Sequence, residues 1–364
     1  MNKKKILIVA KSLSEGGAER AAAILSIMLK DFNYDVSIII LDNKVSYDFY
    51  GNYFILNKEK LKKNFKTRLG FFIDFRNYVK KNNFNYIIDF RTRNSSLREI
   101  LIYRFIYKKV KNIIFTIHLP KLFLYVPRPY FLFKKVYSKA LKNIVVSQEI
   151  KTLLKEKLSL NNTDLIYNAI DINLINKLKN EDILEKDKFI LIVGRMNDDI
   201  KQIDKLINIY TETNLKERNI KLFIMGSGVL TKDIIDSVKS RGLNNDIHFL
   251  SFQENPYKYM SKAMFLVLCS KMEGFPYVIL ESLACGNPVI TFDCRTGPRE
   301  VIVNEYNGLL VEDQNFLELK NAINKFLADS KLYDFCKSNT LKSVEKYDIK
   351  IIAEDWIHVL ELAN

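Results

Sequence analysis

Short apolar segments alternate with longer amphipathic segments along most of the chain. The first apolar segment, residues 5–10, is followed by two glycines and then by residues 18–30, whose apolar positions recur at the spacing of a helix. A second apolar segment, residues 35–41, follows this predicted helix. Strands that alternate with helices build parallel sheets with helices on both faces. The pattern therefore predicts an α/β protein made of doubly wound parallel sheets.

The alternation occurs in two runs, which predicts two domains. The first run continues with predicted strands at residues 86–90, 112–117 and 143–147, and a polar stretch at residues 173–188 then interrupts it. The second run contains predicted strands at residues 189–193, 221–225, 246–250, 265–269 and 288–291, and predicted helices at residues 202–211 and 231–241. We expect domains at residues 1–172 and 173–345. A final helix is expected within residues 346–364, with Trp356 on one face.

Composition agrees with a globular protein of two domains. The chain has 364 residues, of which 48% are hydrophobic and 27% are charged. No apolar run approaches the roughly 18 residues that span a bilayer, and the N-terminus lacks the pattern of a signal peptide. These absences favour a cytoplasmic location. The four cysteines form no C-x-x-C pair, so we expect buried, reduced thiols and no zinc site.

Basic residues are concentrated in the first half of the chain. The formal net charge is +15, and residues 1–180 carry 34 Lys and Arg against 14 Asp and Glu. Residues 100–148 hold ten basic residues, no acidic residue and many aromatic ones. This combination is typical of a surface that lies on anionic lipid headgroups, but it also fits a nucleic-acid groove. A third interpretation is a generally basic protein from an AT-rich genome, in which lysine codons are frequent.

Two glutamates, Glu273 and Glu281, belong to the most specific motif. A predicted strand ends just before S-K-M-E-G-F-P-Y-V-I-L-E, and an apolar helix follows. Eight residues along one helix rise about 12 Å and turn about 80° away from a common face, so the carboxylates converge only if Glu273 lies in the turn and Glu281 within the helix. The amides of Tyr277 and Val278 would then offer an anion site at the helix N-terminus. The alternative is that Glu273 caps the turn and Glu281 faces solvent.

Basic and glycine-containing segments follow two other predicted strands. Arg195 and Lys201 suit a diphosphate, although Asp198 and Asp199 lie between them. Gly226 belongs to a G-S-G segment, which would let a backbone approach a ligand closely. The alternatives are a pair of surface cations and an ordinary tight turn.

The first domain offers a glycine pair and a histidine. Gly16 and Gly17 separate the first strand from the first helix, but the segment lacks the G-x-G-x-x-G pattern, which disfavours a nicotinamide cofactor. His118 follows a predicted strand, and both a pocket role and a structural role remain open. No D-x-D motif occurs, so the clustered carboxylates that would bind a divalent metal are missing. We expect no metal requirement.

Together these segments resemble the retaining glycosyltransferases of family 4, which have the GT-B architecture. The resemblance covers nearly the whole chain. It is carried by V-G-R, G-S-G, the E-x7-E segment from Glu273 to Glu281, G-P-R-E-V-I, N-G-L-L-V and the N-terminal G-G-A-E-R. It implies two Rossmann-like domains that face each other across a cleft, with the C-terminal helix crossing back to the N-terminal domain.

The resemblance also implies a role for each matching residue. Glu281 would bind the ribose of a nucleotide donor, and Glu273 would contact the donor sugar at the reacting centre. Arg195 and Lys201 would hold the diphosphate and stabilise the leaving group without a cofactor. The other implied contacts are Gly274, Phe275, Tyr277 and Val278 in the motif, Gly226 at the base, Gly16 and Gly17 from the other domain, and His118 near the sugar.

The implied reaction moves a hexose or N-acetylhexosamine from a UDP-sugar to a membrane-associated glycan in surface polysaccharide biosynthesis. An anionic, lipid-linked acceptor would bind the N-terminal domain. Lys134, Lys135, Lys139 and Lys142 would dock the enzyme on the inner face of the cytoplasmic membrane, and nucleic acid would not be a partner. The rival interpretations are a sugar-nucleotide epimerase of similar two-domain shape and a non-enzymatic binder of an acidic polymer.

Overall fold

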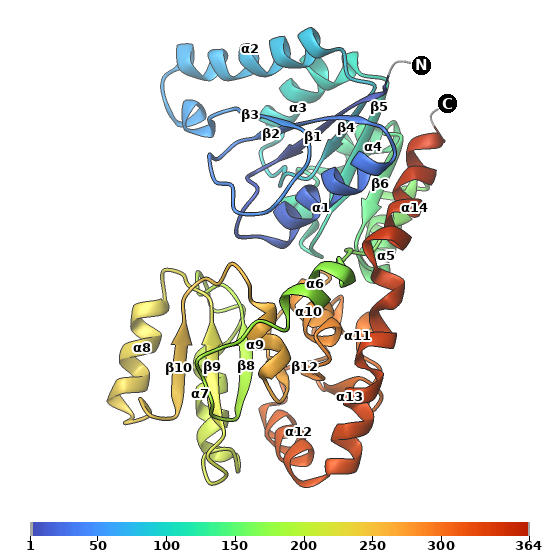
Figure 1. Ribbon diagram of the computed structural model, residues 1–364. Coiled ribbons are helices and arrows are strands. Elements are labelled where there is room, and N and C mark those ends of the chain that lie inside the picture. Colours follow the sequence, from blue (N-terminus) through green and yellow to red (C-terminus); the bar gives the residue numbers. More distant parts are fainter. Residues whose placement is uncertain (1–2, 363–364) are drawn as a thin grey trace. The chain divides into compact units, whose positions relative to one another are not determined.

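The computed structural model describes residues 3–362 and divides into two units, most of whose helices and strands are labelled in Figure 1. Unit 1 comprises the described residues up to Ala169 together with those from Ile349 onwards, and unit 2 comprises Ile170–Asp348. Each unit is built on a parallel sheet with flanking helices. The fold class predicted from the alternating pattern is therefore confirmed.

The sheet of unit 1 has seven strands in the order β3-β2-β1-β4-β5-β6-β7, and each neighbouring pair is parallel. The strands are β1 (Lys5–Ala10), β2 (Asp35–Ile40), β3 (Asn52–Ile55), β4 (Tyr86–Asp89), β5 (Asn112–Ile117), β6 (Lys142–Val145) and β7 (Thr163–Leu165). From β1 the chain passes to β2 on one side, whereas β4 pairs with the other side of β1. Open α/β sheets bind ligands outside the carboxyl ends of the strands at such a switch point.

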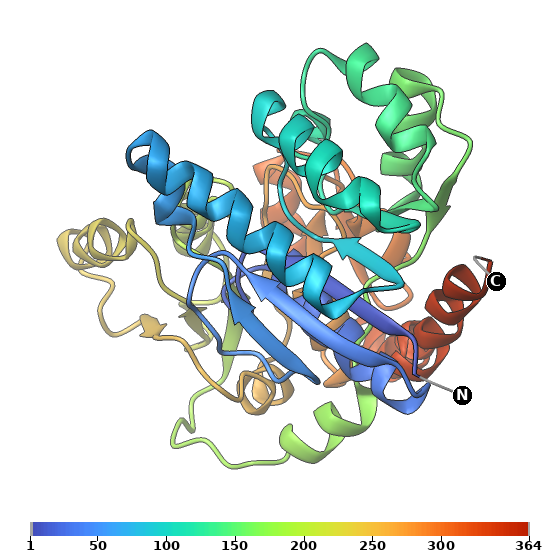
Figure 2. The same cartoon turned by 90° about the horizontal axis from the view of Figure 1, so that it is seen from above.

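Helices cover both faces of this sheet. They are α1 (Gly17–Asp31), α2 (Phe65–Asn82), α3 (Ser96–Phe105), α4 (Tyr130–Ser138), α5 (Gln148–Leu158) and α14 (Ile349–Glu361), with the 3-10 helices η1 (Lys58–Lys62), η2 (Tyr107–Lys109) and η3 (Leu122–Leu124). Figure 2 shows α2, in light blue, running across one face of the sheet. Leu25 and Leu29 of α1 join Trp356 of α14 in a core with alternate residues of β1, β2 and β4.

The C-terminal helix α14 packs on the sheet of unit 1. The Tyr86 hydroxyl on β4 donates a hydrogen bond to the carbonyl of Leu360 at 2.6 Å. The ring of Phe90 stacks on Trp356 with the centroids 6.3 Å apart. The expectation that the last helix returns to the N-terminal sheet is confirmed.

The sheet of unit 2 has six parallel strands in the order β10-β9-β8-β11-β12-β13. They are β8 (Phe189–Val193), β9 (Lys221–Met225), β10 (Ile247–Leu250), β11 (Leu266–Leu268), β12 (Val289–Phe292) and β13 (Gly308–Val311). The helices are α6 (Ile172–Leu178), α7 (Ile203–Glu212), α8 (Thr231–Ser240), α9 (Tyr257–Lys262), α10 (Tyr277–Ala284), α11 (Pro298–Val301), α12 (Phe316–Ala328) and α13 (Ser330–Val344), followed by η4 (Glu345–Tyr347). The polar stretch expected between the two runs therefore contains a helix, α6.

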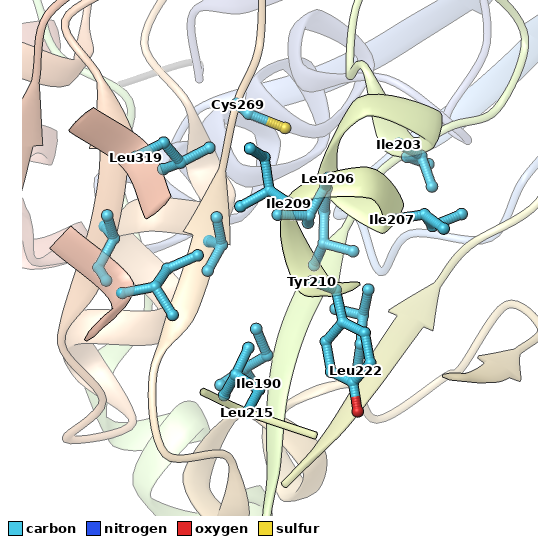
Figure 3. Packing of buried hydrophobic residues seen from close by; sticks show 14 of the residues in the cluster. Ile190, Ile203, Leu206, Ile207, Ile209, Tyr210, Leu215, Leu222, Cys269 and Leu319 are labelled. Carbon is cyan, nitrogen blue, oxygen red and sulfur yellow. The ribbon is translucent and has the colours of Figure 1, made fainter. Parts of the chain in front are cut away.

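Alternate residues of the unit 2 strands form a core with α7, α8 and α12 (Figure 3). Tyr210 of α7 lies in this core beside Leu222, and its hydroxyl donates a hydrogen bond to the carbonyl of Ile220 at 2.9 Å. All four cysteines are buried and free of disulfides. Burial raises the pKa of the Cys269 thiol to about 12, so this side chain stays protonated. The prediction of buried, reduced thiols is confirmed.

Candidate active site

The loops after β8 and β11 bring Lys201 and Glu273 together. The Lys201 Nζ atom lies 2.6 Å from Oε1 of Glu273. Only 19% of the Lys201 side chain and 12% of the Glu273 side chain are exposed. The ammonium is thus already paired with a carboxylate, which the sequence did not indicate. Because an ammonium has three donors, Lys201 keeps the capacity to bind a further oxygen.

Glu273 lies in the turn between β11 and α10, as convergence of the two carboxylates requires. The Thr296 hydroxyl donates a hydrogen bond to the backbone carbonyl of Glu273. The next residue, Gly297, has a φ of +87°, and a Cβ there would lie 2.6 Å from the carbonyl oxygen of Gly274. Only glycine tolerates both conditions, so the loop after β12 closes tightly on the turn that holds Glu273.

Glu281 lies within α10 and is buried, with 4% of its surface exposed. The hydroxyl of Tyr257, on α9, donates a hydrogen bond to Glu281 Oε1 at 3.1 Å. The alternative in which Glu281 faces solvent is therefore wrong. Tyr257 is a contributor that sequence reasoning missed, because no motif surrounds it and it lies 24 residues before Glu281.

The first turn of α10 follows the Glu273 turn directly. Pro276 occupies the N-cap, and Tyr277 and Val278 are the first two helical residues. The amide of Ile279, the third helical residue, donates to the Pro276 carbonyl at 3.2 Å. The N-terminal amides of a helix point along its axis at the positive end of the dipole, which suits an anion. Phe275 is buried, and its ring packs edge-on against the ring of Tyr347, with the centroids 5.3 Å apart.

The V-G-R and G-S-G segments pack against each other. Gly226 has a φ of +135°, and a Cβ there would lie 2.1 Å from the carbonyl oxygen of Gly194. The amide of Met196 also donates to the carbonyl of Ser227 at 3.0 Å. This close approach of two loops accounts for Gly226 without a ligand. The side chain of Arg195 is exposed on the loop after β8.

Gly16 and Gly17 form the start of α1 in unit 1. Gly16 is the N-cap in an extended conformation, and Gly17 is the first helical residue. A Cβ on Gly16 would lie 1.9 Å from Oε2 of Glu19. A carboxylate of the chain itself therefore lies over this helix N-terminus.

His118 follows β5 in unit 1 and is buried. Its Nε2 lies 3.0 Å from the Thr116 hydroxyl, and its ring stacks on Phe90 with the centroids 5.4 Å apart. Burial, with a smaller contribution from Arg93, lowers the pKa of His118 to about 3, so the imidazole is neutral at physiological pH. Its Nδ1 has no hydrogen-bond partner in the described chain.

The four lysines predicted at a membrane surface do not share one environment. Lys134 and Lys135 are exposed on α4, and Lys139 is exposed just after it. Lys142 begins β6, is only 21% exposed and pairs with Asp164 at 2.8 Å. Lys142 therefore differs from the other three, because a carboxylate of the neighbouring strand neutralises it.

Two family models together cover most of the chain. The model described as "Glycosyltransferase Family 4" matches residues 15–174, and the model described as "Glycosyl transferases group 1" matches residues 175–343. A Campylobacter jejuni protein is 30% identical over 98% of this chain and 99% of its own length. It is named N-acetylgalactosamine-N,N'-diacetylbacillosaminyl-diphospho-undecaprenol 4-alpha-N-acetylgalactosaminyltransferase.

The chain belongs to glycosyltransferase family 4. It is a retaining glycosyltransferase, as the resemblance in its motifs implied. The amylovoran biosynthesis glycosyltransferase AmsD of Erwinia amylovora is 25% identical to it over 98% of this chain and 99% of that protein. The epimerase and polymer-binder interpretations are thereby set aside.

Solved structures agree on the GT-B fold of the glycosyltransferase. Sucrose-phosphate synthase from Thermosynechococcus elongatus matches with a TM-score of 0.80 at 21% identity, covering 99% of this chain and 98% of that one. Anabaena HepE in complex with UDP-glucose matches with a TM-score of 0.77 at 18% identity, covering 98% of this chain and 99% of that one. Among the helices of residues 3–362, none combines the length and apolar character that crossing a bilayer requires.

Proposed function

We propose that this enzyme transfers a hexose or N-acetylhexosamine from a UDP-sugar to a lipid-linked glycan during surface polysaccharide biosynthesis. The observation that carries the proposal is the segment from the Glu273 turn into α10. This segment contains Glu273, the N-terminus of α10 and the buried Glu281. The loop after β8 adds Lys201, which forms a shielded ion pair with Glu273. The HepE complex with UDP-glucose and the undecaprenol-linked substrate named for the Campylobacter relative support the choice of donor and acceptor.

Each group of this segment has a part in the proposed reaction. Glu281 is acceptor-only when ionised and binds the ribose hydroxyls, while Tyr257 fixes its orientation. Lys201 keeps Glu273 in place beside the donor sugar and donates to the diphosphate with its remaining N–H groups. The amides at Tyr277 and Val278 face the same anion. Arg195, which is exposed, completes the diphosphate contacts when donor binds.

These groups are cations or amide donors because the proposed reaction builds up negative charge beside them. Breaking the sugar–phosphate bond leaves negative charge on the UDP leaving group and positive character on the sugar carbon. Donors that are already positioned stabilise the leaving group most where water is excluded. The neutral His118 imidazole is suited to a hydrogen bond with a sugar hydroxyl rather than to a charge.

A Glu281→Gln variant tests the proposal. It keeps the shape of the side chain and the Tyr257 contact but removes the charge that accepts two ribose hydroxyls. We expect UDP-sugar affinity, measured by titration calorimetry, to fall by about tenfold or more. The exposed Glu217→Gln in the same unit is the matched control and should bind as the wild type does. Equal UDP-sugar affinity in the wild type and Glu281→Gln would contradict the proposed donor site.

We further propose that unit 1 rests on the inner leaflet of the cytoplasmic membrane through one surface. This aromatic–basic surface consists of Phe123, Arg128, Phe131, Leu132, Lys134, Lys135 and Lys139. Phe131 is 74% exposed, which is unusual for so large an apolar side chain. The Arg128 guanidinium lies 5.5 Å from the ring centroid of Phe123. Apolar side chains that insert at the headgroup level and cations beside them are the features of a helix lying on anionic lipid.

A further inference from the structure

A pocket at the carboxyl edge of the unit 1 sheet has no part in the donor chemistry described above. Its volume is about 160 Å³, close to the cavity of about 150 Å³ that holds a benzene-sized molecule. Its polar lining comes from Lys11, Lys58, Arg91, Thr92, Asn94 and Arg98, and its other lining residues are apolar. Within the described chain, the pocket is thus lined by four cationic side chains and no carboxylate.

Four neighbouring strands deliver the residues of this pocket. Lys11 follows β1, Leu41 follows β2, Lys58 begins η1 after β3, and Arg91 follows β4. These strands are adjacent in the order β3-β2-β1-β4. The pocket therefore lies at the switch point of the sheet, where parallel α/β sheets bind their ligands.

Buried carboxylates hold Arg91 in a fixed position. Its guanidinium donates to the two Asp89 oxygens at 3.0 and 2.7 Å and to Glu99 at 3.0 Å. Arg93, which is also buried, donates to the backbone carbonyls of Asp89, Arg91 and Thr116. A network satisfied in this way is rigid, so it presents one wall of the pocket in a constant shape.

Positive charge exceeds negative charge around the pocket. Lys58 pairs with Asp42, and Arg98 donates to Glu99 at 2.9 Å. Lys11 forms no ion pair with any residue that the structure describes. With the two buried arginines included, five cationic side chains are matched by three carboxylates. The surplus suits an anion that carries about two charges, such as a phosphate ester or a diphosphate.

We propose that this pocket binds the diphosphate group of a lipid-linked acceptor. The proposal rests on the proposed function, since it names the part of the acceptor that unit 1 recognises. The first turn of α3 connects the pocket with the aromatic–basic surface: Arg98 lines the pocket, while the Ser96 hydroxyl donates to the carbonyl of Arg128. Leu97, between them, is 71% exposed. A lipid diphosphate lies at the level of the headgroups, which is where this surface would place the pocket.

Titration of the protein with inorganic diphosphate, in the presence of saturating UDP-sugar that fills the proposed donor site, tests the pocket. Lys11→Ala and Arg98→Gln each remove one cation and leave the Arg91 network with both of its carboxylates. We expect each substitution to weaken diphosphate binding by about tenfold. Lys109→Ala and Arg104→Gln replace exposed residues of the same unit and should leave binding unchanged. Equal diphosphate affinity in the wild type and the Lys11→Ala/Arg98→Gln variant overturns the proposal.

Two further ligands distinguish the diphosphate of a lipid-linked acceptor from that of the nucleotide donor. Phosphatidylcholine vesicles that carry a polyprenyl diphosphate should recruit the wild type at least about tenfold better than the Lys11→Ala/Arg98→Gln variant, while UDP-sugar affinity stays the same. Unchanged vesicle recruitment, or a loss of UDP-sugar affinity in this variant, overturns the assignment to the acceptor. These measurements need no sugar transfer. A negative result with Glu281→Gln would therefore refute the proposed function and leave the pocket result standing.

Discussion

At the residue scale, the Lys201–Glu273 pair differs from the ion pair beside it. The Lys271–Asp199 pair, with a separation of 2.5 Å, joins the same two loops, but its side chains are 45% and 62% exposed. An exposed pair contributes little to stability, whereas removing one partner of a shielded pair leaves an uncompensated charge. The two pairs therefore form a matched comparison within one site.

We expect Lys201→Met to lower kcat by about 100-fold or more, because it removes the proposed hydrogen-bond donor to the leaving group. The same substitution should lower the free energy of unfolding by about 1–3 kcal/mol, because it leaves the Glu273 carboxylate without its cation. Steady-state kinetics and urea unfolding provide the two measurements. Adding Glu273→Gln to Lys201→Met should restore stability without restoring turnover.

Lys271→Met is the control for this prediction, and it should change both quantities little. Similar losses of turnover in Lys201→Met and Lys271→Met would show that the shielded pair has no special part in the reaction.

The burial of His118 has a consequence for acid stability. Its pKa is about 3 in the folded protein and about 6.5 when exposed, so below pH 6.5 the unfolded state binds a proton that the folded state does not. This residue therefore lowers the free energy of unfolding as the pH falls from 6.5 towards 3, by at most about 1.4 kcal/mol per pH unit. His118→Asn should flatten that part of the stability curve, measured by urea unfolding at several pH values. His358→Asn, at an exposed position, should retain the wild-type slope; an unchanged slope in His118→Asn would argue against a neutral buried imidazole.

At the element scale, strands with both faces buried were the easiest to predict. The predicted strands at residues 112–117, 189–193 and 221–225 match β5, β8 and β9 residue for residue. Such strands are continuous apolar runs because helices cover both sides of the sheet. The short edge strand β3 was missed, since it has only four residues and all of them are at least partly exposed. The helix α6 was missed within a polar stretch because it is only seven residues long and has one buried side chain.

In the candidate site too, some features follow from local sequence and others do not. The placement of Glu273 in a turn and Glu281 in a helix follows from local sequence, because Gly274 and Pro276 separate them. The partners of these glutamates do not follow from it. Lys201 lies 72 residues from Glu273, and Tyr257 lies 24 residues from Glu281, so only the order of strands in the sheet brings them together. The Arg91 network was missed for the same reason, although R-T-R directly after a buried strand is an unusual sequence there.

At the scale of the whole molecule, the basic residues are concentrated in the first half of the chain. Residues 1–180 carry 34 basic and 14 acidic residues, yet many of the cations in unit 1 are already paired, as Lys142 is with Asp164. Other basic residues, such as Lys80 and Lys81, are exposed elsewhere on unit 1, while one group lies at the pocket beside α3 and another on the aromatic–basic surface. Both locations suit an acceptor that is anionic and held in a membrane. A nucleotide donor alone would need neither.

We expect the aromatic–basic surface to bind membranes through two separable contributions. One is the attraction of its cations to anionic lipid, and the other is the insertion of its apolar side chains. Lys134→Glu/Lys135→Glu/Lys139→Glu should abolish co-sedimentation with phosphatidylglycerol vesicles, because each cation near such a surface contributes about 1 kcal/mol and each reversal also adds repulsion. Phe131→Ser/Leu132→Ser should weaken binding at high salt as well, where electrostatic attraction is screened but apolar insertion persists. Lys80→Glu/Lys81→Glu/Lys155→Glu, with three exposed lysines elsewhere on unit 1, is the control for charge alone. Equal loss of vesicle binding in both triple variants would mean that net charge, and not this surface, attaches the enzyme to the membrane.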